Sequence, residues 1–294
     1  MLTEQTIMVA NGCNLSCTYC WYEVGSSQYL DATLSPEHYQ GWFAACAAEG
    51  RLSSISITGG EPLLRTDIGE LVDVAGAYAD HVALFTNGTL LTLDLAARLA
   101  EAGCEVHVSL DHVSGGIADK VRGGTRASLR SLDLLASAGA STVQVCVVMT
   151  SRNWRDVEHI AARVAERGFT LELIPVGVPH THPLSLMTLA TGEREQLRAL
   201  LERISTQLDR PLYYGRLGRY LASGVLPRIG SCHAGESGVF INADGDIQIC
   251  AQRNATSLGN IRSSTPADVL AAKRTELALR PAGPCASLDC LVLT

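Results

Sequence analysis

The sequence contains very little lysine and no block of basic residues long enough to follow a phosphate backbone. Of its 23 basic residues, only Lys120 and Lys273 are lysines, and the others are arginines. With a net charge of −7, the chain lacks the electrostatic footprint of a nucleic-acid-binding protein, so no nucleic acid partner is expected. The acidic balance suits a cationic substrate, although it is equally common among soluble bacterial proteins.

Long apolar runs are also absent. No window approaches the roughly 18 apolar residues that indicate a membrane-spanning helix. The first residues, MLTEQTIMVANGC, have neither the basic start nor the apolar stretch of a secretion signal. These absences predict a cytoplasmic protein with no membrane contact. Because the cytosol is reducing, the ten cysteines are expected to bind metal or act in catalysis rather than to form disulfides.

Short apolar runs alternate with amphipathic stretches as far as Pro175. Strands are expected at residues 6–10, 54–58, 82–86, 105–110, 143–149 and 170–175. Helices are expected at residues 36–49, 67–79, 92–102, 125–138 and 153–167, and the glycines that follow the expected helix ends are Gly50, Gly103, Gly139 and Gly168. The alternation predicts an α/β fold of parallel units, as a partial (β/α)6 TIM-like barrel or, alternatively, an open doubly wound sheet. In both folds, functional residues gather at the carboxyl ends of the strands.

The regular alternation ends after Pro175. The elements expected beyond it are a loop over residues 176–191, a helix near 192–208, a β-hairpin over 238–250 and a helix near 266–279. Asp244 and Gly245 supply the turn of the hairpin. A chain of 294 residues is long enough for one large domain and a small second one. We therefore expect a barrel domain over residues 1–190 and a smaller domain over residues 191–294.

Three cysteines follow the first expected strand with the spacing C-x3-C-x2-C, at Cys13, Cys17 and Cys20. Thiolates are the usual ligands of iron–sulfur clusters, and a [4Fe–4S] cluster normally takes four. Three ligands this close together can hold three irons and leave the fourth iron open for a cofactor or substrate. A structural zinc site or chance spacing is the alternative.

Further motifs stand at the ends of the next expected strands. They are Gly59-Gly60-Glu61-Pro62 after the second strand, Thr86-Asn87-Gly88 after the third and Ser109-Leu110-Asp111 after the fourth. An aromatic residue, Tyr19, directly precedes the last clustered cysteine. Each motif alone is weak, but their order along a β/α frame resembles the radical SAM superfamily over roughly residues 5–175.

The resemblance implies that Cys13, Cys17 and Cys20 hold a [4Fe–4S] cluster whose open iron binds S-adenosylmethionine. The other residues it implies for this cofactor are Tyr19, Gly59, Gly60, Glu61, Pro62, Asn87, Ser109 and Asp111. The glycines would let backbone approach the ligand, Glu61 would receive the methionine ammonium, and Asp111 would bind the ribose hydroxyls. Cys146 stands where relatives often have a polar residue facing S-adenosylmethionine, and the alternative is a small buried apolar residue.

Four more cysteines, Cys232, Cys250, Cys285 and Cys290, lie near the C-terminus. The C-x12-G-x4-C pattern that ends at Cys250 resembles the auxiliary-cluster domain of SPASM and twitch enzymes. A full SPASM domain has seven cysteines and two extra clusters, so four cysteines match the shorter twitch form with one auxiliary [4Fe–4S] cluster. Scattered core cysteines are the alternative. Cys250 is expected to be a cluster ligand, or else a free thiol that donates a hydrogen atom.

The resemblance also implies the chemistry, in which a 5′-deoxyadenosyl radical removes hydrogen from a substrate carbon after reduction by a flavodoxin- or ferredoxin-type protein. In size and composition the chain resembles radical SAM enzymes of aminoglycoside pathways, such as the neomycin epimerase. We therefore expect epimerisation of a small-molecule substrate, a cationic aminosugar, ahead of alcohol dehydrogenation through the auxiliary cluster. Peptide modification ranks lower, because a first strand near residue 6 leaves no room for a leader-binding domain. A non-catalytic iron–sulfur protein is the last alternative.

Overall fold

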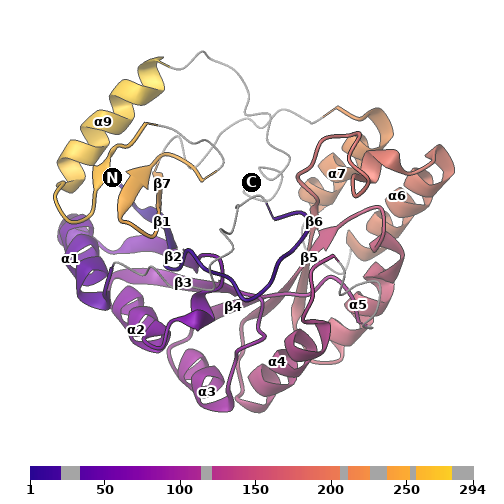
Figure 1. Ribbon diagram of the computed structural model, residues 1–294, viewed down its shortest axis with the longest axis horizontal. Coiled ribbons are helices and arrows are strands. Elements are labelled where there is room, and N and C mark those ends of the chain that lie inside the picture. Colours follow the sequence, from indigo (N-terminus) through magenta and orange to yellow (C-terminus); the bar gives the residue numbers. More distant parts are fainter. Residues whose placement is uncertain (21–33, 114–120, 206–210, 226–236, 252–255, 280–294) are drawn as a thin grey trace.

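The computed structural model describes residues 1–20, 34–113, 121–205, 211–225, 237–251 and 256–279. Its centre is one nine-stranded sheet with the order β6-β5-β4-β3-β2-β1-β7-β8-β9. The parallel strands of the barrel are β1 (Glu4–Met8), β2 (Leu52–Thr58), β3 (Ala79–Thr86), β4 (Glu105–Ser109), β5 (Val143–Met149) and β6 (Thr170–Pro175). They curve into an open arc (Figure 1), which confirms the predicted partial barrel.

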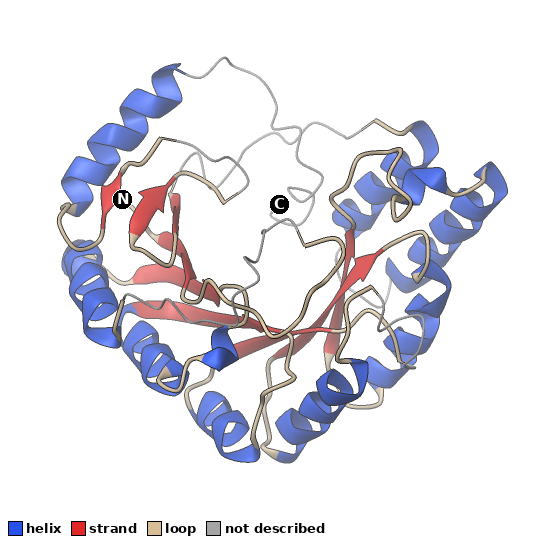
Figure 2. Cartoon of the chain, in the orientation of Figure 1, coloured by secondary structure: helices blue, strands red, loops and turns tan. Residues whose placement is uncertain are grey.

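Helices cover the outer side of this arc (Figure 2). They are α1 (Pro36–Cys46), α2 (Ile68–Tyr78), α3 (Leu93–Glu101), α4 (Thr125–Ser137) and α5 (Val157–Ala165), with short 3₁₀ turns η1 (Ala47–Glu49), η2 (Pro62–Leu64) and η4 (Trp154–Asp156). The predicted helices overrun the observed ends by a few residues, because caps and 3₁₀ turns occupy those positions. Gly103, Gly139 and Gly168 have φ of 64°, 72° and 70°, so left-handed glycines follow the helices as expected.

Side chains of the strands alternate between the two faces of the sheet. In β4, Val106 and Val108 are fully buried in the apolar core beneath the helices. Ser109 of the same strand lines a cavity on the opposite, inner face, because successive residues of a strand point to opposite faces. The inner face of the barrel therefore carries polar side chains where the outer face carries valines.

After β6 the chain forms η5 (Leu186–Thr188), α6 (Thr191–Ser205) and α7 (Pro211–Ser223). Helix α7 was not predicted, because Gly215 and Gly218 interrupt its helical pattern. The Tyr213 hydroxyl donates a hydrogen bond to Leu173 O at 2.7 Å, and Leu173 N donates to the Tyr214 hydroxyl at 3.4 Å. Helix α7 thereby satisfies backbone groups of β6, the outermost strand of the sheet.

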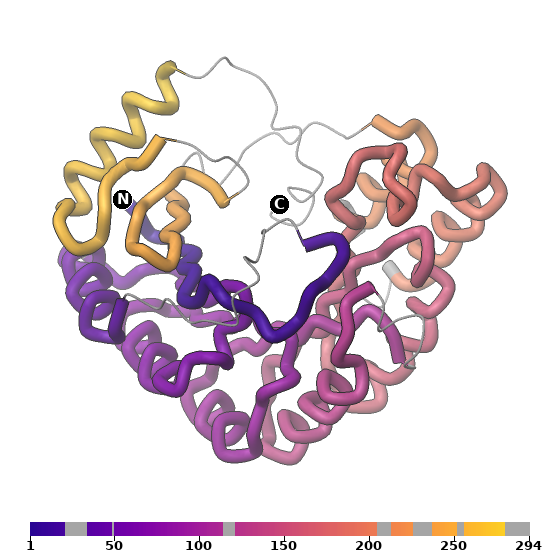
Figure 3. The backbone as a smooth tube through the Cα atoms, in the orientation of Figure 1, coloured from indigo at the N-terminus to yellow at the C-terminus, as the bar shows by residue number. Residues whose placement is uncertain are grey.

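The predicted hairpin is present as β7 (Gly238–Ile241) and β8 (Asp246–Gln248), followed by β9 (Gly259–Asn260). Gly245 has a φ of 85° and lies in the predicted turn. Strand β7 pairs in parallel with β1, from Glu4 opposite Gly238 to Ile7 opposite Ile241. The hairpin therefore continues the barrel sheet, and in Figure 3 the indigo N-terminal strand runs beside the orange hairpin. A domain division near residue 190 stays a prediction.

The last described helix, α9 (Pro266–Leu279), packs beside this extension of the sheet. Its Lys273 is 2% exposed and donates a hydrogen bond to Gly238 O at 2.7 Å. A buried ammonium is tolerated where a carbonyl accepts from it, so this contact ties α9 to β7. Among the described residues, no helix is both long enough and apolar enough to cross a bilayer.

We predict that Lys273→Met lowers the apparent melting midpoint of the cluster-loaded protein by roughly 3–10 °C. The substitution keeps the apolar stem but leaves the Gly238 carbonyl without its charged donor, a loss of about 1.5–3 kcal/mol. Differential scanning fluorimetry under anaerobic conditions measures the shift. Arg274→Met, the same chemical change at the exposed neighbouring position, is the control and should shift the midpoint by less than about 1 °C. Equal shifts in the two variants would contradict the role of Lys273.

Candidate active site

The carboxyl ends of the parallel strands surround a cavity of about 230 Å³. The polar and flexible positions in its lining come mainly from the ends of β2, β3 and β4 and from the loops after β1, β2 and β3. They are Cys13, Cys17, Tyr19, Cys20, Thr58, Gly59, Gly60, Glu61, Thr86, Asn87, Ser109, Arg122 and Gly177. The apolar wall includes Phe85, Val148, Ile174 and Pro175. Motifs that are far apart in the sequence therefore meet at one place, as the strand-end argument predicted.

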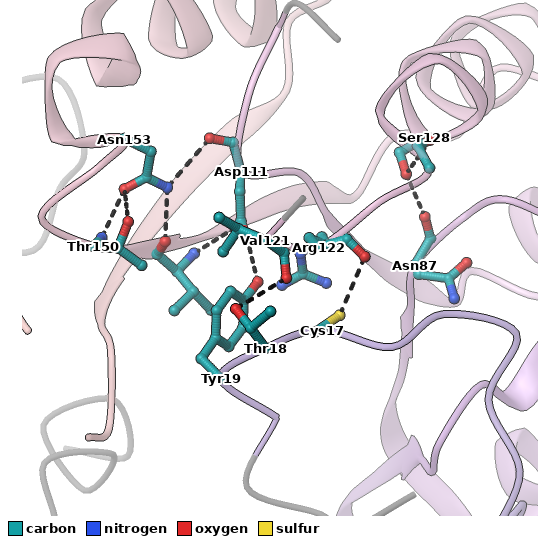
Figure 4. Close-up of polar contacts among 12 residues, drawn as sticks. Cys17, Thr18, Tyr19, Asn87, Asp111, Val121, Arg122, Ser128, Thr150 and Asn153 are labelled. Carbon is teal, nitrogen blue, oxygen red and sulfur yellow. Dashed lines mark hydrogen bonds and ion pairs between the residues drawn. The ribbon is translucent and has the colours of Figure 1, made fainter. Parts of the chain in front are cut away.

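The loop with the three clustered cysteines is held by residues 121–122 (Figure 4). Thr18 N donates a hydrogen bond to Val121 O at 2.8 Å, and the Thr18 hydroxyl donates to the same oxygen at 3.4 Å. Cys17 Sγ lies 3.7 Å from Arg122 O. These contacts fix the middle of the loop against the segment that precedes α4.

A buried ion pair lies beside this loop and includes Asp111 (Figure 4). Asp111 Oδ2 lies 2.9 Å from Arg122 Nε and also accepts a hydrogen bond from the Tyr19 hydroxyl. Asp111 Oδ1 accepts from Val148 N at 2.9 Å. Burial and the nearby Asp111 charge raise the pKa of Tyr19 well above its ordinary value, so the phenol stays a hydrogen-bond donor. Asp111 thus anchors Tyr19, and it is not among the residues that line the cavity.

Gly59 and Gly60 lie where the chain leaving β2 meets the chain leaving β1. Gly60 N donates to Ala10 O at 2.8 Å, and Glu61 N donates to Gly12 O at 2.9 Å. A Cβ atom on Gly59 would come within 2.8 Å of Ala10 O, and one on Gly60 would overlap the Gly12 carbonyl. The close approach expected at these glycines is therefore made by the backbone that leads into the cysteine loop.

Glu61 is 1% exposed and is held by three donors. Its Oε1 accepts from the Thr86 hydroxyl at 2.6 Å and from Leu63 N at 2.9 Å, and its Oε2 accepts from Asn87 N at 2.7 Å. Burial raises the pKa of Glu61, and the three hydrogen bonds oppose that rise. An ionised carboxylate has about four acceptor positions, so one remains for a donor inside the cavity.

Asn87 joins the end of β3 to the cysteine loop. Its Nδ2 donates to Asn14 Oδ1 at 2.9 Å and lies 3.9 Å from Cys13 Sγ. Its main-chain carbonyl accepts from the Ser128 hydroxyl at 2.7 Å, which ties it to α4 (Figure 4). Asn87 is thus fixed from both sides, with its amide beside the first cysteine.

The donor set fits an iron–sulfur cluster. Cys13, Cys17 and Cys20 are free thiols that line the same cavity. Burial raises the pKa of Cys13, and it raises the pKa of Cys17 to about 11. Because ligation requires thiolates, binding of iron at this loop releases protons.

Not every predicted site residue reaches the cavity. Pro62 is buried at the start of η2, Cys146 lies in the barrel wall, and Cys250 follows β8 half-buried against the core. Together with Asp111, these residues are absent from the cavity lining. Cys232, Cys285 and Cys290 lie outside the described residues.

Two arginines with structural roles at the site were missed from sequence. The pairing of Arg122 with Asp111 depends on a tertiary contact that the sequence pattern does not reveal. Arg65 is 5% exposed, donates to Val9 O at 3.1 Å and to Leu34 O at 3.0 Å, and pairs with Asp67 at 2.7 Å. The sequence could have indicated that Arg65 is buried, because it directly follows the apolar run Pro62–Leu64.

We predict that Gly60→Ala lowers the iron content of the protein by more than half. The new methyl group overlaps the Gly12 carbonyl, so the backbone leading into the cysteine loop must move. Iron and sulfide analysis after anaerobic reconstitution measures the effect. Gly76→Ala in α2 is the matched control, since its Cβ would meet nothing within 4 Å and alanine favours the helix by about 0.5–1 kcal/mol. Wild-type iron content in Gly60→Ala would show that the close contact does not position the loop.

Comparison with known proteins agrees with this geometry. The family description "Radical SAM superfamily" matches residues 7–164, and the description "Iron-sulfur cluster-binding domain", SPASM, matches residues 232–290. The chain is 30% identical over 267 residues to the mycofactocin maturase MftC of Mycolicibacterium smegmatis, covering 85% of this chain and 65% of that protein. It is 35% identical over 234 residues to a probable GTP 3′,8-cyclase of Methanopyrus kandleri, covering 75% of this chain and 71% of that protein.

Solved structures share the fold at lower identity. Streptococcus suis SuiB bound to S-adenosylmethionine superposes with a TM-score of 0.71 at 16% identity, covering 91% of this chain and 65% of that one. The enzyme anSMEcpe with bound AdoMet superposes with a TM-score of 0.72 at 20% identity, covering 94% and 80%.

The chain spans 65% of the length of the mycofactocin maturases from two species, so about a third of each of those proteins has no counterpart in it. It spans 71% of the archaeal cyclase at 35% identity, and the superfamily description covers more than half of its residues. The chain therefore belongs to the radical SAM superfamily, which binds S-adenosylmethionine and a [4Fe–4S] cluster, and it carries a SPASM region for auxiliary iron–sulfur ligation.

Proposed function

We propose that this radical SAM enzyme removes a hydrogen atom from a carbon of a peptide substrate. One observation carries the proposal: the cluster cysteines and Glu61 line a cavity whose remaining described wall is almost uncharged. When bound, the cluster and S-adenosylmethionine supply the radical chemistry, with an electron from a flavodoxin- or ferredoxin-type reductant. The protein contributes position, orientation and exclusion of water.

Different residues of the cavity contribute to binding, orientation and exclusion of water. Glu61 is held rigidly by three donors, and its remaining acceptor position suits the ammonium of the methionine moiety. The Ser109 hydroxyl at the end of β4 suits a polar group of the nucleoside. Phe85, Val148 and Ile174 form an apolar wall that keeps water away from a reactive carbon.

The charge of the lining supports a peptide over the GTP that the archaeal relative is named for. A nucleoside triphosphate carries several negative charges and calls for several cationic donors. Among the described lining residues, the basic side chain is Arg122, and it is paired with Asp111 at 2.9 Å. A largely apolar wall suits an uncharged side chain of a peptide, and the mycofactocin relatives are named as maturases.

Aminosugar epimerisation, which the sequence favoured, has less support. In the described lining, the carboxylate that could bind an ammonium group is Glu61, and the protein itself occupies most of its acceptor positions. Cys250, which the sequence offered as a hydrogen-atom donor if it is not a cluster ligand, does not line the cavity. The relatives reported above are maturases and cyclases, so peptide modification moves ahead of epimerisation.

We further propose one auxiliary [4Fe–4S] cluster with Cys232, Cys250, Cys285 and Cys290 as ligands. Full ligation by four thiolates leaves no open iron, which suits electron transfer. Cys250 directly follows a hairpin that is continuous with the barrel sheet, and this continuity supports a fixed position for the auxiliary site relative to the cavity.

We predict that the reconstituted protein forms 5′-deoxyadenosine from S-adenosylmethionine under anaerobic dithionite, and that Cys17→Ala reduces this to background. The loss of one of three clustered thiols leaves too few ligands for the cluster. Liquid chromatography with mass detection measures the product. Cys46→Ala, which removes a half-buried thiol on α1, should keep wild-type activity. Equal activity in Cys17→Ala and the wild type would contradict the assignment.

We predict that a candidate peptide substrate, labelled with deuterium at its side-chain carbons, transfers deuterium to 5′-deoxyadenosine. Hydrogen removal from the peptide requires this transfer, and mass spectrometry of both products detects it. Parallel reactions contain GTP or neomycin-type aminosugars in place of the peptide. Consumption of either compound coupled to 5′-deoxyadenosine, with an unchanged peptide, would refute the peptide proposal while leaving the radical SAM activity intact.

A further inference from the structure

A second cluster of ligand-type side chains lies inside the barrel, outside the cavity lining. It contains His107 of β4, Cys146 of β5 and Glu172 of β6, which are 8%, 7% and 5% exposed. The three strands are consecutive neighbours in the sheet. Two residues further along the same strands, Ser109, Val148 and Ile174 line the cavity, so the cluster faces the interior one layer below it.

Two of the separations between the ligand atoms match tetrahedral coordination. Cys146 Sγ lies 3.6 Å from His107 Nδ1 and 3.7 Å from a Glu172 carboxylate oxygen, and the three atoms all lie within 4.8 Å of one another. Zinc bonds of about 2.3 Å to sulfur and about 2.0–2.1 Å to nitrogen or oxygen place tetrahedral ligand atoms roughly 3.5 Å apart. The Cys146 sulfur therefore stands at metal-ligand spacing from both of the other ligand atoms.

The other ring nitrogen of His107 is oriented as in metal sites. His107 Nε2 lies 3.1 Å from Glu105 Oε1, and the hydrogen bond from His107 lowers the pKa of Glu105. The His107 ring also stacks on Phe85, with ring centroids 4.2 Å apart. A carboxylate that accepts from one ring nitrogen leaves the lone pair of the other nitrogen available, and metal-binding histidines commonly have such a partner.

We propose that His107, Cys146 and Glu172 bind one zinc ion inside the barrel, with its fourth position open to water. Thiolate, imidazole and carboxylate are the ligand types that zinc takes, and the two negative charges offset the charge of the ion. The ion would join β4, β5 and β6. Ser109, Val148 and Ile174, which lie two residues further along these strands, form one wall of the cavity. It is separate from the iron held by Cys13, Cys17 and Cys20.

Zinc analysis and X-ray absorption at the zinc edge test the proposal on cluster-loaded protein incubated anaerobically with one equivalent of ZnCl2 and then desalted. The expected result is about one zinc per chain beyond the iron, with one sulfur near 2.3 Å and nitrogen or oxygen near 2.0–2.1 Å. Cys146→Ala and Glu172→Gln should each lower the zinc content at least tenfold at unchanged iron. Cys104→Ala, which removes another buried thiol of the barrel, should retain it.

Two results would overturn the zinc site. One is wild-type protein with full iron but less than about 0.1 zinc per chain. The other is zinc bound by three or four sulfur atoms, which would place it at the cluster cysteines instead. If Cys146→Ala failed to fold, the wild-type absorption spectrum would still decide, because it distinguishes one sulfur ligand from several.

Discussion

The close contact between the chain leaving β1 and the chain leaving β2 determines the geometry of the active site. Two backbone hydrogen bonds, from Gly60 N to Ala10 O and from Glu61 N to Gly12 O, extend strand pairing past the ends of both strands. The extension works only with glycine at positions 59 and 60, because any side chain would displace the partner backbone. It places Glu61 against the end of β3 and leads into the loop whose cysteines line the cavity, so both halves of the cofactor site depend on one strand junction.

Sequence patterns predicted the parts of the fold that arise locally. Strands β5 and β6 match their predicted bounds, because both segments consist mostly of β-branched and aliphatic residues, which is typical of buried parallel strands. Helix α7 escaped prediction because its glycines lower helix propensity and its tyrosines find their partners in β6. Tertiary contacts overrode the local signal at that point.

At the candidate site, too, local sequence patterns predicted some features and tertiary contacts decided the others. The cysteine spacing and the strand-end motifs located the cavity, since parallel strands bring their carboxyl ends together. The role of Asp111 did not follow from its motif, because its partners Tyr19 and Arg122 lie elsewhere in the chain and only the folded structure joins them. The motifs also did not predict the substrate, since its recognition depends on which charged groups of the cavity wall remain unpaired in the folded structure.

The pairing of β1 with β7 has a consequence for biosynthesis. During translation β1 leaves the ribosome early, while the strand that pairs with its second side lies more than two hundred residues later. Until β7 is synthesised, the strand that leads into the cysteine loop has one set of backbone groups exposed, and such nascent chains associate readily. The strand that leads into the cysteine loop is therefore expected to reach its final position, and the loop its iron-binding geometry, only after β7 has been synthesised.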